Sequence, residues 1–187
     1  MIDELGRLEK NKPACAPTLQ PFGSACRATM FDSPGREMRT VPETELQRLA
    51  VNNIGNAPSP LGNYSHAVWA GNTLFVAGQG ARDAATGKEA GVVVDDKGNV
   101  VSYDIAAQTR AVLHNLTLVL KAAGCTLQDL VDVTVFLKDM NDFEKYNQVY
   151  SEYFGFPNPP ARTTVQVAGL PGKNFIEIKA IACKSRS

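Results

Sequence analysis

The segments Pro159-Pro160-Ala161-Arg162-Thr163-Thr164-Val165-Gln166-Val167 and Asn174-Phe175-Ile176-Glu177-Ile178-Lys179-Ala180-Ile181 decide the fold. Both alternate along their length, which is the pattern of a strand with one face toward a core. In the first segment, one face carries Thr163, Val165 and Val167, and the other carries Arg162, Thr164 and Gln166. In the second, one face carries Ile176, Ile178 and Ala180, and the other carries Phe175, Glu177 and Lys179. Because proline cannot donate to a strand ladder, Pro159 and Pro160 mark where the first strand begins.

The chain before these two strands predicts three more strands and two helices. The strands are expected over residues 64–70, 73–78 and 130–137, and the helices over residues 104–123 and 141–154. Asp104 is a good N-cap for the first helix, and Gly124 ends it. Asn141 and Glu144 have the spacing of a capping box at the start of the second helix. The elements therefore follow the order β-β-α-β-α-β-β.

This order is typical of an α+β fold in which two helices pack on one face of a mixed sheet. The other face stays uncovered. We expect it to carry Arg162, Thr164, Gln166, Glu177 and Lys179 together with Phe136 and Phe175. Such a mixed face is typical of an ordinary solvated surface, but it is also a candidate subunit interface. We expect an oligomer with polar sites in the clefts between subunits.

Residues 1–50 differ from the rest of the chain. Prolines and glycines recur between residues 13 and 35 with little periodicity, which indicates a poorly ordered N-terminal extension. Near its end, residues 44–50 predict a short helix. The compact domain is expected over residues 51–187. Within it, residues 81–103 are expected to form a long loop with a turn at residues 95–99.

Composition excludes several functional classes. Lys plus Arg and Asp plus Glu both number 19, so the net charge is zero, and we expect no nucleic-acid partner. No apolar run approaches the roughly 20 residues of a membrane span, so no membrane association is expected. The N-terminus lacks the basic start and apolar core of a secretory signal. Cys15, Cys26, Cys125 and Cys183 lack metal-ligand spacing, so we expect free thiols, no metal site and a cytoplasmic location.

Arg162 and Glu177 are the side chains that suggest chemistry. The arginine fork binds a carboxylate bidentately, and a glutamate can act as a general base toward water. Together they predict a site for a small carboxylic acid that undergoes water addition or proton transfer. In a simple hairpin turning near Pro171, however, the two residues would lie about 13 Å apart. A neighbouring subunit or the length of the arginine would have to close that gap.

Two further features, the glycines after a predicted strand and an asparagine in the second helix, allow two interpretations each. The pair Gly78 and Gly80 ends a predicted strand, either as a plain strand end or where the backbone approaches a ligand. Asn147 interrupts the apolar stripe of the second helix, and its amide either ties down a loop or contacts a ligand or subunit. His114 lies on the solvated face of the first helix, so we do not expect it to be catalytic.

Several motifs resemble those of the RidA (YjgF) family of imine and enamine deaminases. The resemblance covers residues 55–184 and is carried by the following segments: 160–165, 170–171, 176–182, 61–65, 77–79, 107–110 and 138–143. It implies a chorismate-mutase-like fold and a homotrimer with three sites at the subunit interfaces. The implied reaction is the hydrolysis of 2-imino or 2-amino-enoic acids to keto acids and ammonia, without a cofactor.

The resemblance also implies roles for individual residues. Arg162 matches the arginine that holds the substrate carboxylate, helped by the backbone N–H near Gly78, and Glu177 matches the glutamate that positions the attacking water. Tyr64 and Asn147 match residues that line the pocket, which favours a site role for Asn147. Thr164 also belongs to the predicted site. It stands where many members have cysteine, so thiol regulation there is not expected.

A narrower resemblance concerns the substrate. The segments 104–112, 140–143, 146–150, 162–165 and 92–98 are similar to the 2-aminomuconate deaminase branch, which acts in the degradation of aromatic compounds. Its substrate is an enamine carboxylate with a second carboxylate at the far end. The alternatives are a general 2-imino acid deaminase, a ribonuclease or translation inhibitor, a holdase-type stress protein and an inactive metabolite-binding module.

Overall fold

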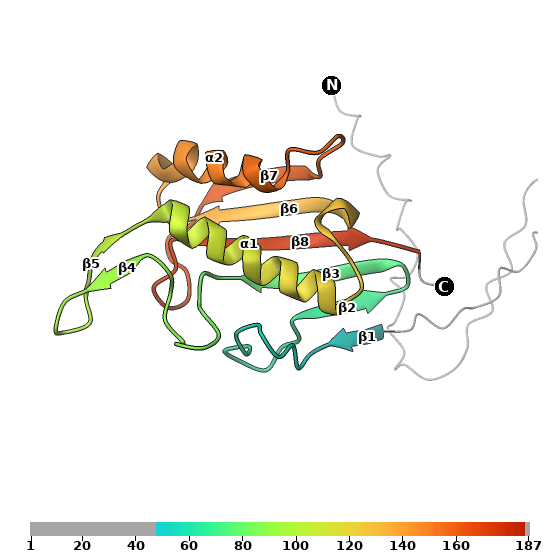
Figure 1. Cartoon of the computed structure of the whole chain (residues 1–187), viewed down its shortest axis with the longest axis horizontal. Coiled ribbons are helices and arrows are strands. Elements are labelled where there is room, and N and C mark those ends of the chain that lie inside the picture. The colour runs from blue at the N-terminus through green and yellow to red at the C-terminus, as the bar shows by residue number, and fades with distance from the viewer. Residues whose placement is uncertain (1–47, 186–187) are drawn as a thin grey trace, which may run out of the picture. The chain divides into compact units, whose positions relative to one another are not determined.

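The structure, a computed structural model, describes residues 48–185, and Figure 1 shows its elements. The strands and helices, in chain order, are β1 (Arg48–Val51), β2 (Ala67–Ala70), β3 (Thr73–Gln79), β4 (Val92–Val94), β5 (Val100–Tyr103), α1 (Ile105–Ala122), β6 (Leu130–Leu137), α2 (Phe143–Tyr153), β7 (Ala161–Gln166) and β8 (Ile176–Cys183). Two 3-10 turns, Leu127–Asp129 and Met140–Asp142, precede β6 and α2. The predicted α+β fold is confirmed. The seven predicted elements follow one another as expected, and β1, β4 and β5 are additional strands.

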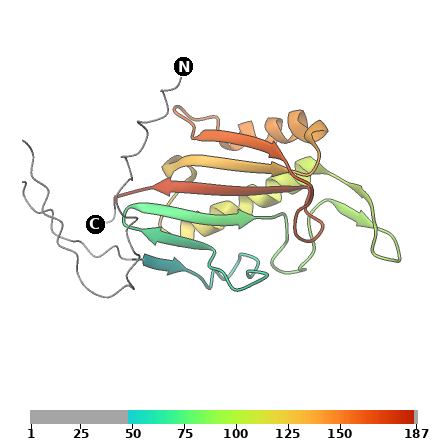
Figure 2. The ribbon, with the colours of Figure 1, turned by 180° about the vertical axis from the view of Figure 1, so that it is seen from behind.

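A six-stranded mixed sheet in the order β1-β2-β3-β8-β6-β7 forms the main layer. Both helices lie on one of its faces (Figure 1), and the view from behind shows the strands of the other face without helical cover (Figure 2). The core lies between the helices and the sheet. Its fully buried side chains include Leu113 and Leu116 of α1, Val133 and Val135 of β6, and Ile178 of β8.

Helix α1 forms as the sequence predicts. The side chain of Asp104 accepts a hydrogen bond from the backbone N–H of Ala106, which caps the first turn. Gly124 has a φ of 75°, a conformation that glycine adopts at little cost, and it stops the helix. His114 is exposed, as expected from its position on the polar face.

Helix α2 begins later than predicted. Residues 140–142 form a 3-10 turn capped by Asp139, and the α-helix starts at Phe143. The predicted capping box of Asn141 and Glu144 is therefore wrong. The carboxylate of Asp139 accepts a hydrogen bond from the backbone N–H of Asn141, so the 3-10 turn is capped two residues before the predicted N-cap.

The last two strands do not form a hairpin. β7 pairs parallel to β6 on one side, and β8 pairs antiparallel to β6 on the other. α2 connects β6 to β7, and a helical crossover of this kind joins parallel strands. The assumed hairpin with a turn near Pro171 is wrong, because β6 lies between its two strands.

The predicted grouping of polar residues on one face is also wrong. Arg162 and Thr164 of β7 point toward α2, where they contact its side chains. Glu177 lies between the buried residues Ile176 and Ile178, so it points to the uncovered face. Phe175 is buried rather than part of that face. Its ring stacks on the ring of Tyr103 at a centroid distance of 3.6 Å.

Two parts of the sheet structure were not predicted. Arg48–Val51 form β1, an edge strand paired with β2, so the short helix expected over residues 44–50 is wrong for Arg48–Ala50. The predicted long loop 81–103 contains the hairpin of β4 and β5, which projects beyond the N-terminal end of α1 (Figure 1). Its turn lies at residues 95–99, as expected, where the Asp95 carboxylate accepts from the N–H of Asn99.

The rest of the predicted extension, residues 1–47, lies outside the described residues, and so do Cys15 and Cys26. Cys125 and Cys183 are free thiols. Among the helices of residues 48–185, none has both the length and the apolar character needed to cross a membrane.

Candidate active site

A cavity of about 230 Å³ opens where β3 ends. Its lining comes from a loop before β2, from the residues around the end of β3, from α1 and from β8. The lining residues are Pro58, Ser59, Pro60, Leu61, Gly62, Tyr64, His66, Gly78, Gln79, Gly80, Arg82, Asn115, Pro171, Asn174 and Glu177. We call these residues the cavity half of the site. Three of the predicted site residues, Tyr64, Gly78 and Glu177, belong to it.

Glu177 and Gly78 are matched in shape. The pairing of β3 with β8 shifts register between Val76 and Gln79, so a bulge carries Gly78 close to the Glu177 side chain. A Cβ atom at Gly78 would lie 2.8 Å from Cδ of that carboxylate, so any side chain at position 78 would displace the Glu177 carboxylate from its present position. Burial raises the pKa of Glu177 above its usual range. The carboxyl is thus suited to proton transfer nearer neutral pH than an exposed glutamate.

Two buried amides hold the backbone that surrounds the cavity. Asn115 of α1 donates from Nδ2 to the carbonyl oxygens of Gly80 and Arg82, at 2.9 Å each. Asn174 accepts from the N–H of Ala81 at 2.8 Å and donates to the carbonyl of Pro171 at 2.7 Å. Since each amide makes two hydrogen bonds to loop backbone, the segment after β3 is held against both α1 and the loop before β8.

Tyr64 and His66, which immediately precede β2, also line the cavity. Tyr64 is half exposed, and its hydroxyl accepts a hydrogen bond of 3.2 Å from the N–H of Leu61. His66 is buried. Burial, and then the positive charge of Arg82, lower the pKa of His66, so its imidazole is neutral at pH 7.

The other three predicted site residues, Arg162, Thr164 and Asn147, form a second group between β7 and α2. Arg162 donates from Nη1 to Oδ1 of Asn147 at 2.8 Å. Its guanidinium lies over the rings of Tyr150 and Tyr146, with centroid distances of 4.5 Å and 5.7 Å. The hydroxyls of Thr164 and Tyr146 are 2.5 Å apart and share a hydrogen bond. We call Arg162, Thr164 and Asn147 the arginine half of the site.

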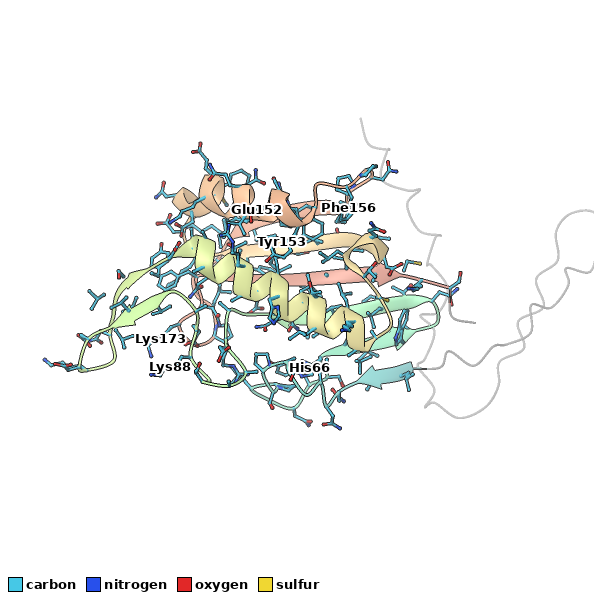
Figure 3. All side chains as sticks on the ribbon, in the orientation of Figure 1. His66, Lys88, Glu152, Tyr153, Phe156 and Lys173 are labelled. Atoms are coloured by element: carbon cyan, nitrogen blue, oxygen red, sulfur yellow. The ribbon has the colours of Figure 1, made fainter. Side chains whose placement is uncertain are left out.

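The two halves are far apart within one chain. Along β6, Arg162 pairs with Val133 and Glu177 pairs with Phe136. This offset of three residues amounts to about 10 Å along the strand, and two strand spacings add about 10 Å across it. In Figure 3, His66 of the cavity half lies toward the β1–β2 edge of the sheet, whereas Glu152 and Tyr153 of α2, the helix that Arg162 contacts, lie toward the β7 edge.

The six predicted site residues thus divide three and three, and one chain does not bring Arg162 to Glu177. Arg82, Asn115 and Asn174 also line the cavity and were not among the predicted site residues. Asn115 interrupts the apolar stripe of α1 in the same way that Asn147 interrupts that of α2, so its signal was present in the helical spacing. The part of the chain that the structure describes contains no group of three or more His, Cys, Asp or Glu side chains placed to hold a metal ion.

A model of the family described as endoribonuclease L-PSP matches residues 54–184, nearly the whole of the described chain. This chain belongs to that family, which is also called RidA or YjgF. The predicted family membership is therefore confirmed.

Known members of the RidA family match over most of their length. A RutC family protein of Pyrococcus horikoshii is 51% identical over 129 residues, which are 69% of this chain and 93% of that protein. The human 2-iminobutanoate/2-iminopropanoate deaminase is 38% identical over 132 residues, or 71% of this chain and 88% of that protein. The crystal structure of the YjgF gene product of E. coli superposes with a TM-score of 0.61 at 37% identity, covering 73% of this chain and 98% of that one.

Proposed function

We propose that this RidA-family protein is a hydrolytic deaminase of small 2-imino and enamine carboxylic acids. The observation that carries the proposal is the carboxyl of Glu177. It lines a cavity, burial raises its pKa, and it forms no ion pair among residues 48–185. A carboxyl in such surroundings is suited to moving a proton to or from a bound water.

In this proposal, Arg162 holds the carboxylate of the substrate through the bidentate geometry of its guanidinium. Glu177 accepts a proton from water as the oxygen adds to the imine carbon, and it returns this proton to the nitrogen, which gives a carbinolamine. Glu177 then moves the proton of the carbinolamine hydroxyl to the amine as the carbonyl forms, the C–N bond breaks and ammonia leaves. An enamine is first protonated at carbon to give the imine. One imino acid and one water yield one keto acid and one ammonia, so the reaction requires no cofactor.

The separation of the two halves leads us to propose a site between copies of the chain. β7 is an edge strand, and Arg162 on it is exposed. The uncovered face of the sheet carries Phe75 and Val165, exposed by 44% and 39%, which favours its burial against other copies. A head-to-tail ring would pair the arginine half of one copy with the cavity half of the next, and the homotrimer of our expectation is such a ring.

The names of relatives support the reaction class. The human, rat and bovine relatives are 2-iminobutanoate/2-iminopropanoate deaminases at 38–39% identity. For this chain we infer a cytoplasmic deaminase, and the resemblance of the segments 104–112 and 146–150 makes 2-aminomuconate its proposed substrate. The alternative is a general deaminase of short 2-imino acids. The family description as an endoribonuclease gives a second activity to test, although the net charge of zero argues against RNA binding.

The test is ammonia release from freshly generated 2-aminomuconate and from 2-iminobutanoate, measured for the wild type, Arg162→Ala and Glu177→Gln. We expect turnover that prefers 2-aminomuconate and falls by about 100- to 10,000-fold in Glu177→Gln. A preference for 2-iminobutanoate would identify a general metabolite-repair enzyme. Turnover of neither acid by the folded protein would contradict the proposal, and RNA cleavage or client protection in the same preparation would then identify the alternative.

A further inference from the structure

Arg82 is a cation in the cavity half that the proposed reaction does not use. It follows the end of β3, is half-buried and lines the same cavity as Glu177. Its Nη2 donates a hydrogen bond to the carbonyl oxygen of Ser59, another lining residue. This single bond uses one of the five N–H groups of the guanidinium.

The acidic residues nearest to Arg82 in the chain are engaged elsewhere. The Asp83 carboxylate accepts from the N–H of Ala85 and from both the N–H and the hydroxyl of Thr86, which closes its own turn. Glu89 accepts at Oε1 from the N–H of Lys173. Across residues 48–185, Arg82 forms no ion pair. A half-buried guanidinium without a counterion is costly, so the binding of an anion to it is favoured.

The lining residues include one other basic side chain, His66, and it is buried and neutral at pH 7. Among the lining residues, Arg82 is thus the cation and Glu177 the acid. The two lie in one cavity of about 230 Å³, below the usual range of about 300–1,000 Å³ for drug-sized ligands. A short molecule that reacts near Glu177 would therefore have its far end within the same small space as Arg82.

We propose that Arg82 binds a second carboxylate, at the end of the substrate away from the reacting carbon, and so selects dicarboxylic imino and enamine acids. This inference rests on the proposed function, in which Arg162 of a neighbouring copy holds the first carboxylate. The guanidinium of Arg82 is positioned in advance by its bond to Ser59 and by Asn115, which holds the Arg82 carbonyl. Preorganised binding of this kind lowers the ordering cost on association.

The test separates binding from turnover by means of two unreactive six-carbon diene acids. Trans,trans-muconate carries a carboxylate at each end, and sorbate has the same diene with one carboxylate. Their affinities are measured by calorimetry for the full-length wild type, Arg82→Met, Arg82→Lys and Lys88→Met. The last variant removes an exposed lysine of the same segment, outside the cavity. Ammonia release from 2-aminomuconate and 2-iminobutanoate is measured in parallel.

We expect the wild type and Lys88→Met to bind muconate about 10- to 100-fold more tightly than sorbate. Arg82→Met should abolish this difference while leaving the affinity for sorbate within about threefold, and Arg82→Lys should restore part of it. In turnover, Arg82→Met should raise KM for 2-aminomuconate by a clearly larger factor than KM for 2-iminobutanoate.

Three outcomes would overturn the inference. The wild type could bind both acids with equal affinity, or the preference for muconate could survive in Arg82→Met. Alternatively, Arg82→Met could lose affinity for muconate and sorbate equally, which would assign Arg82 to supporting the Ser59 loop. The proposed function fails separately. If neither imino acid is deaminated but the muconate preference depends on Arg82, the subsite stands and the reaction does not. If 2-iminobutanoate is deaminated without any Arg82-dependent preference, the reaction stands and the subsite does not.

Discussion

Arg162 donates a hydrogen bond of 2.8 Å from Nη1 to Oδ1 of Asn147, and this bond joins β7 to α2. The same guanidinium lies over the ring of Tyr150. Its direction is thus set from two sides before any substrate binds. A carboxylate that reaches this guanidinium from a neighbouring copy would meet donors already in place, which lowers the entropy cost of binding.

Asn147→Ala tests this positioning. Without the acceptor, Arg162 keeps its charge but loses its fixed direction, so we expect KM for 2-iminobutanoate to rise about 3- to 10-fold with a smaller change in kcat. Stability should change by less than about 1 kcal/mol, because the bond is exposed. Steady-state kinetics and urea unfolding check both expectations. Gln148→Ala, an exposed neighbour on α2, is the control, and equal kinetics for the two variants would contradict a positioning role.

Thr164→Val tests the support beneath Arg162. The substitution keeps the shape of the side chain but removes the hydroxyl that shares a hydrogen bond with Tyr146, whose side chain is fully buried. An unsatisfied buried hydroxyl costs about 1–3 kcal/mol, so the free energy of unfolding should fall by that amount. Chemical denaturation measures it. Thr163→Val, on the opposite face of β7, is the matched control, and a loss as large as that of Thr164→Val would refute the assignment to the Tyr146 contact.

The sequence predicted both helices and five strands of the main sheet, but not which strands lie next to each other. Asp104 and Gly124 set the ends of α1 through local capping, which depends on residues close in the chain. The order of the strands depends on contacts between distant segments. The helix between β6 and β7 is itself typical of a parallel pair, whereas the alternation of the last two strands is compatible with a hairpin as well as with the observed pairing on either side of β6.

The candidate site shows the same limit. Arg162 and Glu177 were recognised as residue types, yet alternation alone could not tell which face of each strand would be covered by helices. The role of Asn174 depends on its contacts with Ala81 and Pro171, and no periodic pattern reports such contacts. Arg82 lies in a segment expected to be a loop, and its place in the cavity follows only from the folded backbone.

Gly78→Ala tests the close fit around the Glu177 carboxyl, to which we assign proton transfer in the proposed function. The added methyl group would meet the Glu177 carboxylate, which must then turn away from its present position. We expect kcat for 2-iminobutanoate to fall by at least about 100-fold, since misplacement of a reacting group by about 1 Å has an effect of that size. The matched control is Gly62→Ala in the same cavity, where the new Cβ would contact the Tyr64 ring at an ordinary 3.7 Å. Equal activities of the two variants would disprove the role given to Gly78.

The half-buried carboxyl of Glu177 should also make the free energy of unfolding depend on pH. Burial raises the pKa of Glu177 in the folded protein, so the folded state binds its proton more tightly than the unfolded state does. The contribution of Glu177 to stability is therefore fully present below its unfolded pKa of about 4.3 and is lost as pH rises through the folded value. Glu177→Gln removes this term, so the variant should gain stability relative to the wild type between pH 4 and pH 7.

Urea unfolding of both proteins at pH 4, 5, 6 and 7, at one fixed protein concentration, measures the difference. The fixed concentration matters because association of copies also adds to apparent stability. A difference in unfolding free energy that grows with pH and then levels off supports a desolvated carboxyl at position 177. A constant difference would mean that Glu177 titrates alike in the folded and unfolded states, and a shrinking one would mean that a cation, such as an arginine from a neighbouring copy, stabilises its charged form.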